Sequence, residues 1–254
     1  MKILNTREVQ LRLLEMAIAV RDILELHHIP YFITYGTLLG AVRHHGFIPW
    51  DDDFDIYIFD ESYDGAIEIL RTSLPKDCFL EDDKSEEKYF HAWAHVKDEH
   101  TIAECEQFPQ DGQYLHKGIS LDLYRAYQIP ANQLMCFKHK MHLEYLERRK
   151  AVGLIEENDF AIRYAKVTSN YKAECELTTN NVDKHNIYSF VDPYNGYFEC
   201  QELLPLRYYE FEGEQFLGPN DYAGFLQRCY GNYMELPPIE KRTPHYSKVS
   251  SLID

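Results

Sequence analysis

Apolar residues recur at helical spacing near the N-terminus, between residues 6 and 28. Ile29-Pro30 follows and predicts the end of this helix, because the residue before a proline avoids helical conformation. Residues 31–35 are rich in β-branched and aromatic side chains and predict a short strand. Gly36 ends that strand, and residues 37–43 predict a short helix. A strand, a glycine turn and a short helix therefore follow one another here.

The pattern changes character after about residue 128. Strands are predicted at residues 54–59, 89–97 and 119–127, and helices at residues 61–71, 133–149, 159–176 and 221–230. No internal repeat or low-complexity linker separates these segments. We expect an α+β fold in which residues 1–128 form the core. Residues 129–254 are then a helical and mixed portion packed on that core.

The chain has 254 residues and a formal net charge of −16. Phosphate backbones are bound through Lys and Arg, so this excess of acid argues against a nucleic-acid partner. It does not exclude a nucleotide, which a metal ion can bridge to acidic side chains. No apolar stretch reaches membrane-spanning length, and the N-terminus lacks the apolar core of a signal peptide. The six cysteines are widely spaced, without a C-x-x-C pattern. We therefore expect a cytoplasmic protein with reduced thiols, with paired cysteines in a secreted protein as the alternative.

Two acids alternate at the start of the strand predicted at residues 54–59. Asp53 and Asp55 are two positions apart, and in an extended strand such residues project from the same face. Two carboxylates held side by side repel each other, so a cation is the expected partner that keeps them together. Mg²⁺ and Mn²⁺ are bound by carboxylate and phosphate oxygens. The D-x-D spacing thus predicts a divalent metal site, although the same spacing also occurs in ordinary loops.

A phosphate-binding arrangement precedes these acids. Gly36 allows the backbone to approach a ligand closely, and the helix that begins at Thr37 presents free N–H groups at its N-terminus. Arg43 follows later in the same helix, with a guanidinium suited to phosphate. Taken alone, Gly36 and Thr37 are explained as a helix cap and Arg43 as a surface charge. Together, and just before an acid pair, they indicate a site for a phosphate group beside a metal.

The segment YGTLLGAVRHHGFIPWDDDFDI resembles the signature of the LicD family almost residue for residue. That family includes bacterial phosphocholine transferases and the animal fukutin-related proteins, and its fold belongs to the nucleotidyltransferase superfamily. A second stretch, LPLRYYEFEGEQFLGPNDYAGFLQRCYGNYMELPP, resembles the C-terminal block of the family. Residues 130–195, between the two stretches, show no recognisable resemblance.

This resemblance implies a nucleotidyltransferase-like mixed β-sheet flanked by helices, with a helical C-terminal elaboration. Gly36 and Thr37 fall at the phosphate-holding turn of the family, and Asp53 and Asp55 at its metal-binding acids. Superfamily members use a third carboxylate on a neighbouring strand, and Asp122 in GISLDLYRAY is the best match. The family usually shows Ile-Asp-Ile-Phe-Pro there, whereas this chain reads Leu-Asp-Leu-Tyr-Arg, without the proline. An isolated strand acid is the alternative interpretation of Asp122.

The resemblance also implies an activity, the Mg²⁺- or Mn²⁺-dependent transfer of a phosphate-linked group from a CDP-activated alcohol such as CDP-choline. The acceptor would be a cell-surface glycan or its lipid-linked precursor, such as teichoic acid, lipopolysaccharide or a capsule repeat. The protein would meet a lipid-linked acceptor at the inner face of the membrane, by peripheral contact. Arg43 would hold donor phosphate, and Asp122 would bind metal and accept the proton from, or orient, the acceptor hydroxyl.

Three other functions fit parts of the pattern. A nucleotidyltransferase would use the same acids but would release pyrophosphate from an NTP. A D-x-D glycosyltransferase would use a nucleotide sugar, although the strand, turn and helix before the acids favour the nucleotidyltransferase fold. A catalytically inactive module that binds glycan or nucleotide is disfavoured by the presence of acids at all three positions.

Other polar residues near these segments have weaker signals. Asp51 and Asp52 either orient the metal-binding acids or cap the loop, and we expect Trp50 to pack under the loop rather than stack on a base. Further candidates for contact with phosphate or metal are Lys97, His116, His91, His95, Arg242 and His245. The last two are expected to lie in a solvated tail. The two histidines of the strand at residues 89–97 are too far apart along it for one zinc ion.

Overall fold

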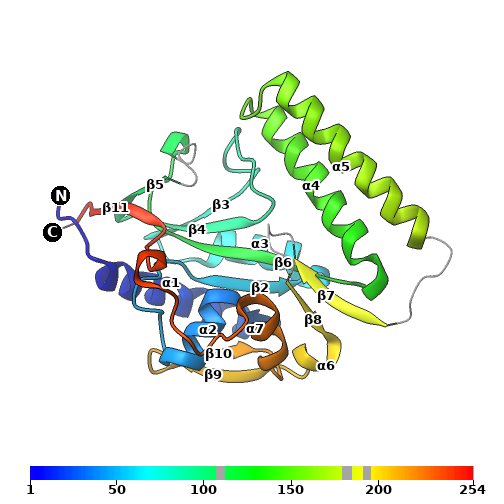
Figure 1. Cartoon of the computed structure of the whole chain (residues 1–254). Helices are drawn as coiled ribbons and strands as arrows, with labels where there is room; N and C mark the ends of the chain where they lie inside the picture. The colour runs from blue at the N-terminus through cyan, green and yellow to red at the C-terminus, as the bar shows by residue number, and fades with distance from the viewer. Residues whose placement is uncertain (107–111, 179–184, 191–195, 254) are drawn as a thin grey trace.

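The computed structural model describes residues 1–253 except 107–111, 179–184 and 191–195, and in this part helices surround a mixed sheet (Figure 1). The helices are α1 (Thr6–Leu26), α2 (Tyr35–His44), α3 (Asp60–Ser73), α4 (Leu134–Ala151), α5 (Glu157–Thr178), α6 (Cys200–Leu203) and α7 (Ala223–Tyr230). The strands are β1 (Tyr31–Ile33), β2 (Asp55–Phe59), β3 (Cys78–Glu81), β4 (Ala94–Asp98), β5 (Thr101–Cys105), β6 (Ser120–Pro130), β7 (Asn186–Phe190), β8 (Tyr197–Glu199), β9 (Arg207–Phe211), β10 (Glu214–Gly218) and β11 (Tyr246–Ser251).

The main sheet has seven strands, ordered β1-β2-β6-β4-β3, and β7 and β8 extend it from β6. β2 and β6 are parallel, whereas β1, β4 and β7 pair antiparallel with their neighbours. At 11 residues, β6 is long enough to pair with β4 near its start and with β7 at its end. The expectation of a mixed sheet flanked by helices is confirmed, while its nucleotidyltransferase-like character stays a prediction.

The helices with strong apolar periodicity are confirmed, but several strands have no counterpart in the sequence prediction. β3, β5, β7 and β8 are three to five residues long, and short runs carry little periodicity. The strand expected at residues 89–97 begins only at Ala94, because a loop precedes it. β6 crosses residue 128, and residues beyond this point continue the same sheet. The division of the chain at residue 128 stays a prediction.

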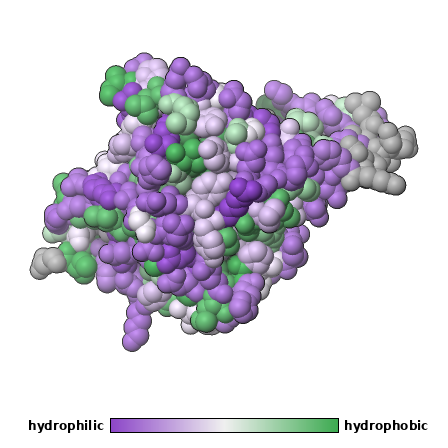
Figure 2. Space-filling model, turned by 90° about the horizontal axis from the view of Figure 1, so that it is seen from below, coloured by the Kyte–Doolittle hydropathy of each residue, from purple (hydrophilic) through white to green (hydrophobic). Residues whose placement is uncertain are grey.

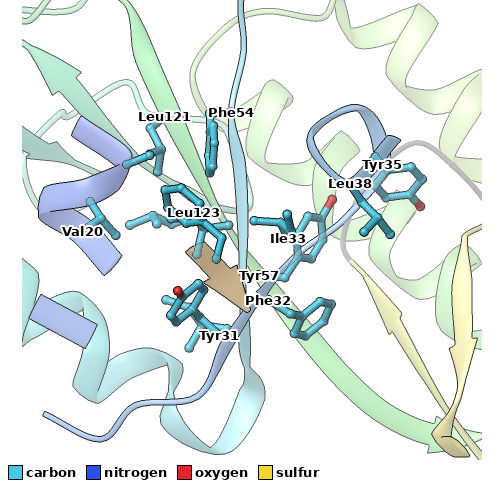
Figure 3. Close-up of a cluster of buried hydrophobic side chains, with 14 of the residues drawn as sticks. Val20, Tyr31, Phe32, Ile33, Tyr35, Leu38, Phe54, Tyr57, Leu121 and Leu123 are labelled. Atoms are coloured by element: carbon cyan, nitrogen blue, oxygen red, sulfur yellow. The ribbon is translucent and has the colours of Figure 1, made fainter. Parts of the chain in front are cut away.

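The hydrophobic core lies on both faces of the sheet. On one face Val20 of α1 packs beside Leu121 and Leu123 of β6, and all three are fully buried (Figure 3). On the other face aromatic rings form the core, with Tyr57 stacked on Tyr124 at a centroid distance of 4.9 Å. Phe32 adds a further stacked contact to Tyr57 at 5.7 Å. The many aromatic residues of the chain are therefore largely structural, and they hold β2 and β6 in a fixed relation.

Helices α4 and α5 form an antiparallel hairpin that projects from the body of the molecule (Figure 1). A disulfide between Cys136 and Cys175, with the Cα atoms 5.8 Å apart, joins the start of α4 to the end of α5. The expectation of reduced thiols is wrong for this pair, because the hairpin brings together two cysteines that are distant in sequence. Lys138 donates to the backbone carbonyl of Phe190 and so ties α4 to β7.

Polar side chains dominate the surface seen in Figure 2, where apolar residues form separate groups. None of the helices in the described part of the chain combines the length and the apolar character needed to span a bilayer.

Candidate active site

The acidic run after Trp50 forms the loop that leads into β2. Asp52 is buried in this loop, with only 4 % of its side-chain surface exposed. Its carboxylate accepts hydrogen bonds from the backbone N–H groups of His245 (2.6 Å) and Tyr246 (3.1 Å). Asp52 thus fastens the start of β11 to the loop. The sequence left two interpretations of Asp52 open, orientation of the metal-binding acids and capping of the loop. The anchoring of a distant segment is a further role, and the two earlier interpretations stay predictions.

The three acids expected to carry the chemistry lie together. Asp55 begins β2, and Asp122 is its directly opposed partner on the parallel strand β6. Asp53 lies two residues before Asp55, and all three carboxylates line one cleft of about 480 Å³. Burial, followed by the charges of Asp53 and Asp122, raises the pKa of Asp55 well above its ordinary value. The parallel register of β2 and β6 therefore brings together acids that are far apart in sequence.

Asp51 adds a fourth carboxylate to this recess. Burial, and then the charge of Asp53, raises the pKa of Asp51 well above its ordinary value. Burial also raises the pKa of Asp53, but its side chain keeps 36 % of its surface exposed, so water offsets part of the effect. Carboxylates that repel one another in a recess are the hard oxygen ligands that a divalent cation needs. These residues fit a Mg²⁺ or Mn²⁺ site.

His245 is the unexpected member of the cluster. Its Nδ1 atom lies 3.2 Å from Asp52 Oδ1, and 3.6 Å from an oxygen of Asp51 and of Asp53. The hydrogen bond to Asp52 and the charge of Asp53 raise the pKa of His245 to about 10. The expectation that His245 lies in a solvated tail is wrong, because the hydrogen bonds of Asp52 bring the C-terminal segment back to the acids.

Two sets of possible metal ligands therefore overlap at Asp53. Among the described residues, one ligand atom each from Asp51, Asp53 and His245 lies within 4.8 Å of the others. The set implied by the family resemblance is Asp53, Asp55 and Asp122, which line the cleft together. Both sets include Asp53, just before the start of β2, and which of them would hold a divalent cation stays a prediction.

Gly36 and Thr37 lie in the first turn of α2, directly after β1, as the strand–turn–helix prediction requires. The Thr37 hydroxyl accepts a hydrogen bond from the backbone N–H of Asp55 (3.0 Å), which ties α2 to the start of β2. A Cβ atom placed on Gly36 would lie 2.9 Å from Asp51 Oδ2. The absence of a side chain at Gly36 therefore leaves room for an acid of the cluster.

Arg43 binds the C-terminal segment rather than the acids. Its guanidinium donates to the backbone carbonyls of Tyr233 (2.7 Å) and Glu235 (3.2 Å). The described residues that line the cleft do not include Gly36, Thr37 or Arg43. Their role toward a phosphate stays a prediction, and Gly36 and Thr37 lie beside the acid loop, next to Asp51 and the backbone of Asp55 respectively.

Asp122 is held from several sides within the cleft. Its Oδ2 atom accepts hydrogen bonds from the indole N–H of Trp93 (3.1 Å) and from the hydroxyl of Tyr124 (3.2 Å). Its Oδ1 atom lies 3.5 Å from Nε2 of His95. The Trp93 and Tyr124 rings pack on each other with centroids 4.8 Å apart. The Asp122 carboxylate is therefore built into a fixed setting, which argues against an isolated strand acid.

Comparisons with known proteins identify relatives of this chain. The profile of the LicD/FKTN/FKRP nucleotidyltransferase domain matches residues 28–153, about half of the chain. The lipopolysaccharide cholinephosphotransferase LicD of Haemophilus influenzae is 27% identical over 269 aligned residues, which cover 97% of each chain. The chain belongs to the LicD family. Uncharacterized proteins of Rickettsia prowazekii and Rickettsia typhi are 58% identical over 40 residues, 16% of this chain and 15% and 13% of theirs.

The LicD-family match contains the residues of the turn and the acids of β2 and β6. His245 lies outside residues 28–153, although it contacts Asp51, Asp52 and Asp53. The relative from Haemophilus influenzae aligns over nearly the whole chain, so its similarity extends to the C-terminal segment. In this LicD-family protein, the acid site is therefore completed by a segment beyond the matched domain.

The weaker candidates have different surroundings in this LicD-family fold. Lys97 and His91 line the cleft, whereas His116 stacks on Phe79 and pairs with Glu99. Arg242 lies over the ring of Trp50, with its guanidinium carbon 5.1 Å from the ring centroid, and Trp50 packs against the core as expected.

Sequence reasoning did not identify Trp93, Tyr124 and Glu81 as neighbours of the site. A signal was available for His95 and Lys97 of β4, because residues two apart on a strand face the same way, whereas His91 and Trp93 lie in the loop before this strand. In the structure, all four line the cleft. This signal did not show which strand lies beside them.

Proposed function

We propose that this LicD-family phosphotransferase moves a phosphate-linked alcohol, such as phosphocholine, from a CDP-activated donor to a hydroxyl group of a glycan. The observation that carries the proposal is the meeting of Asp53, Asp55 and Asp122 in one cleft beside the β1–α2 turn. The cholinephosphotransferase from Haemophilus influenzae, similar over 97% of both chains, supports the choice of phosphocholine. Lipopolysaccharide, or a related surface glycan or lipid-linked precursor, is the proposed acceptor class.

The acids at the cleft would hold Mg²⁺ or Mn²⁺, which when bound neutralises negative charge on the donor diphosphate. Asp53 and Asp55 are the proposed ligands, together with Asp122. The first turn of α2, at Gly36 and Thr37, would lie against the donor phosphate with its backbone N–H groups. Asp51 and His245 would offer further ligand atoms beside Asp53.

The transfer breaks the phosphoanhydride bond of the donor and forms a phosphate ester with the acceptor. The acceptor hydroxyl oxygen forms a bond to the phosphorus that carries the alcohol, and the bond from that phosphorus to the oxygen of CMP breaks. The proton of the acceptor hydroxyl goes to Asp122, which is oriented by Trp93 and Tyr124. The products are CMP and the substituted glycan, so no oxidant or further co-reactant is needed.

Product analysis tests this proposal. The protein is incubated with CDP-choline, CDP-glycerol, CDP-ribitol, CTP or a UDP-sugar, each with and without Mg²⁺ or Mn²⁺. We expect metal-dependent release of CMP from a CDP-alcohol in the presence of a glycan acceptor. Pyrophosphate release from CTP would indicate a nucleotidyltransferase instead, and UDP release from a sugar donor a glycosyltransferase.

Ligand-induced thermal stabilisation gives an independent measurement, since a tight ligand raises apparent stability by mass action. We expect the largest shift for a CDP-alcohol with metal and its loss in Asp55→Asn. Glu61→Gln changes an exposed acid just after β2 and serves as the matched control. A shift of the same size without metal, or in both variants, contradicts the proposed site.

A further inference from the structure

Four ionisable side chains form a line across four adjacent strands. Glu81 of β3 is the directly opposed partner of His95 on β4, and His95 is the partner of Asp122 on β6. Asp122 in turn is opposite Asp55 on β2. Side chains that are directly opposed lie on the same face of a sheet. These residues, which we call the polar row, run from the buried edge of the sheet to the acids of the cleft.

The polar row is connected by close contacts. Nδ1 of His95 lies 3.1 Å from Glu81 Oε2 and 3.1 Å from the hydroxyl of Tyr89. The opposite ring nitrogen, Nε2, lies 3.5 Å from Asp122 Oδ1. The imidazole therefore bridges the two carboxylates, and Glu81 and Tyr89 fix the plane in which the ring presents Nε2 to Asp122.

The neighbouring row of the same strands shows what packing alone would select. Leu80 precedes Glu81 on β3, and Val96 follows His95 on β4. Leu80 is opposite Val96, and Val96 is opposite Leu121 of β6. These three side chains are apolar and are at most 3 % exposed. Glu81 and His95 are equally buried, at 0 % and 3 %. A buried carboxylate is costly unless it is well partnered, and Glu81 is partnered by His95 and by Lys97, whose Nζ atom lies 3.9 Å from Glu81 Oε2. Apolar packing alone therefore does not account for the polar row.

The other partners of Asp122 leave His95 with a specific task. Asp122 Oδ2 already accepts hydrogen bonds from Trp93 and Tyr124. Among the side chains that the structure describes, His95 lies against Asp122 Oδ1, with its Nε2 atom 3.5 Å away. If the ring were removed, the carboxylate could rotate about its Cβ–Cγ bond while keeping one of the two bonds to Oδ2.

We propose that His95 and Glu81 are positioning residues for Asp122, holding its carboxylate in the orientation that the site uses. Glu81 acts on Asp122 through the His95 ring, and it also pairs with Lys97 of the same cleft. This inference rests on the proposed function, in which Asp122 binds metal and accepts the proton of the acceptor hydroxyl. It adds two buried residues whose proposed role is exerted through Asp122.

The test compares variants of His95 with a matched variant of the same strand. His95→Ala removes the ring, and His95→Gln places an amide N–H near the position of Nε2. Glu81→Gln keeps the shape of the side chain but not its charge. Val96→Ala is the control, because it removes buried volume from β4 on the opposite face. For each variant, kcat and KM for the donor, Mn²⁺ affinity by calorimetry, and Tm are measured.

We expect His95→Ala to lower kcat, and to weaken Mn²⁺ binding, by about 10- to 100-fold while KM for the donor changes little. His95→Gln should recover part of both losses, and Glu81→Gln should show a smaller loss of the same kind. Val96→Ala should lower Tm at least as much as His95→Ala but leave Mn²⁺ affinity unchanged. If Val96→Ala and His95→Ala affect kcat and Mn²⁺ binding equally, His95 has only a structural role and the inference is overturned.

The Mn²⁺ measurement separates this inference from the proposed reaction. If the wild-type protein releases no CMP from any CDP-alcohol, the proposed function fails, while the effect of His95 on metal affinity still decides the role of the polar row. If His95→Ala does not fold, the comparison of Glu81→Gln and His95→Gln with Val96→Ala decides it. Unchanged Mn²⁺ affinity and kcat in both of those variants would then overturn the inference.

Discussion

Asp55 and Asp122 lie directly opposite each other on the parallel strands β2 and β6, with their carboxylates in the same cleft. The two residues are distant in sequence, and the charge of Asp122 disfavours the ionised form of Asp55. A folded protein that keeps two such acids together sacrifices stability at this position. The arrangement is therefore explained by what binds between the carboxylates rather than by packing.

Asp55→Asn should raise stability in the absence of metal while abolishing transfer. The pKa of Asp55 is raised in the folded state, so the stability of the wild type falls as the pH rises above the unfolded-state value of this carboxyl group. At neutral pH the amide removes that penalty, and we expect Tm in EDTA to rise by at least about 2 °C. Differential scanning fluorimetry checks this, with Glu61→Gln as the control. A lower Tm would show that Asp55 is stabilising in the metal-free protein.

Gly36→Ala should fold normally and lose activity. Gly36 lies in the first turn of α2, but its added Cβ would lie 2.9 Å from Asp51 Oδ2 and would displace that carboxylate. Gly65→Ala in α3 is the matched control, since nothing lies within 4 Å of a Cβ there. We expect the control to gain up to about 1 kcal/mol of stability and to keep full activity.

The Gly36 variant is read out by CMP release and by calorimetric Mn²⁺ binding. We expect both to fall at least about tenfold relative to Gly65→Ala, the range typical of residues that support metal ligands. Unchanged Mn²⁺ affinity in Gly36→Ala would mean that the position of Asp51 does not matter to the metal site.

The part of the site between β1 and β2 can be predicted from the sequence, because it is formed by residues that are close together along the chain. The order of β1, the turn at Gly36, α2 and the acids of β2 follows from alternation, helix signals and the D-x-D spacing. Asp122 required the family resemblance, because no rule of spacing states which strand pairs with β2. Thr37 is predicted as a phosphate contact, and the structure shows in addition that its hydroxyl binds the backbone of Asp55.

The rest of the site depends on contacts between distant segments. The exposed, polar sequence around His245 gives no local reason to expect that its ring lies among the acids. The pairing of β3 and β4, which places Glu81 beside His95, could not be predicted from the sequence either, since β3 is only four residues long. Burial of a charged side chain runs against the average behaviour of its residue type. Such positions are where prediction from pattern fails and where function is concentrated.

Asp52→Ala should release the start of β11 from the acid loop. The Asp52 carboxylate accepts the backbone N–H groups of His245 and Tyr246, and hydrogen bonds to a charged group contribute about 1.5–3 kcal/mol. We expect hydrogen exchange of these two amides to become at least about tenfold faster. Exchange within α3, on the other side of the sheet, should stay unchanged. Retained protection at both amides would show that the pairing of β11 with β5 suffices to hold the segment.

Arg7→Met should destabilise the protein at neutral pH but not in acid. The Arg7 guanidinium forms two hydrogen bonds to Glu212, at 2.8 and 2.7 Å, and these bonds hold the pKa of Glu212 below its ordinary value. A lowered carboxyl pKa contributes stability above the unfolded-state pKa, and this contribution is lost as the pH falls through the folded-state pKa. Since the Arg7 side chain is 51 % exposed, we expect a loss of under about 1 kcal/mol.

The pH dependence of this loss separates the charge interaction from the packing of the Arg7 side chain. Urea unfolding of wild type and Arg7→Met is compared at neutral pH and at about pH 3, below the ordinary range of a glutamate. The contribution of Arg7 is lost as the pH falls through the lowered folded-state pKa of Glu212, so the two midpoints should lie closer together at the lower pH. If the difference between the midpoints is the same at both pH values, the charge interaction does not account for the loss of stability. The aliphatic stem of Arg7 then stabilises the contact of α1 with the β9–β10 turn in a way that methionine does not reproduce.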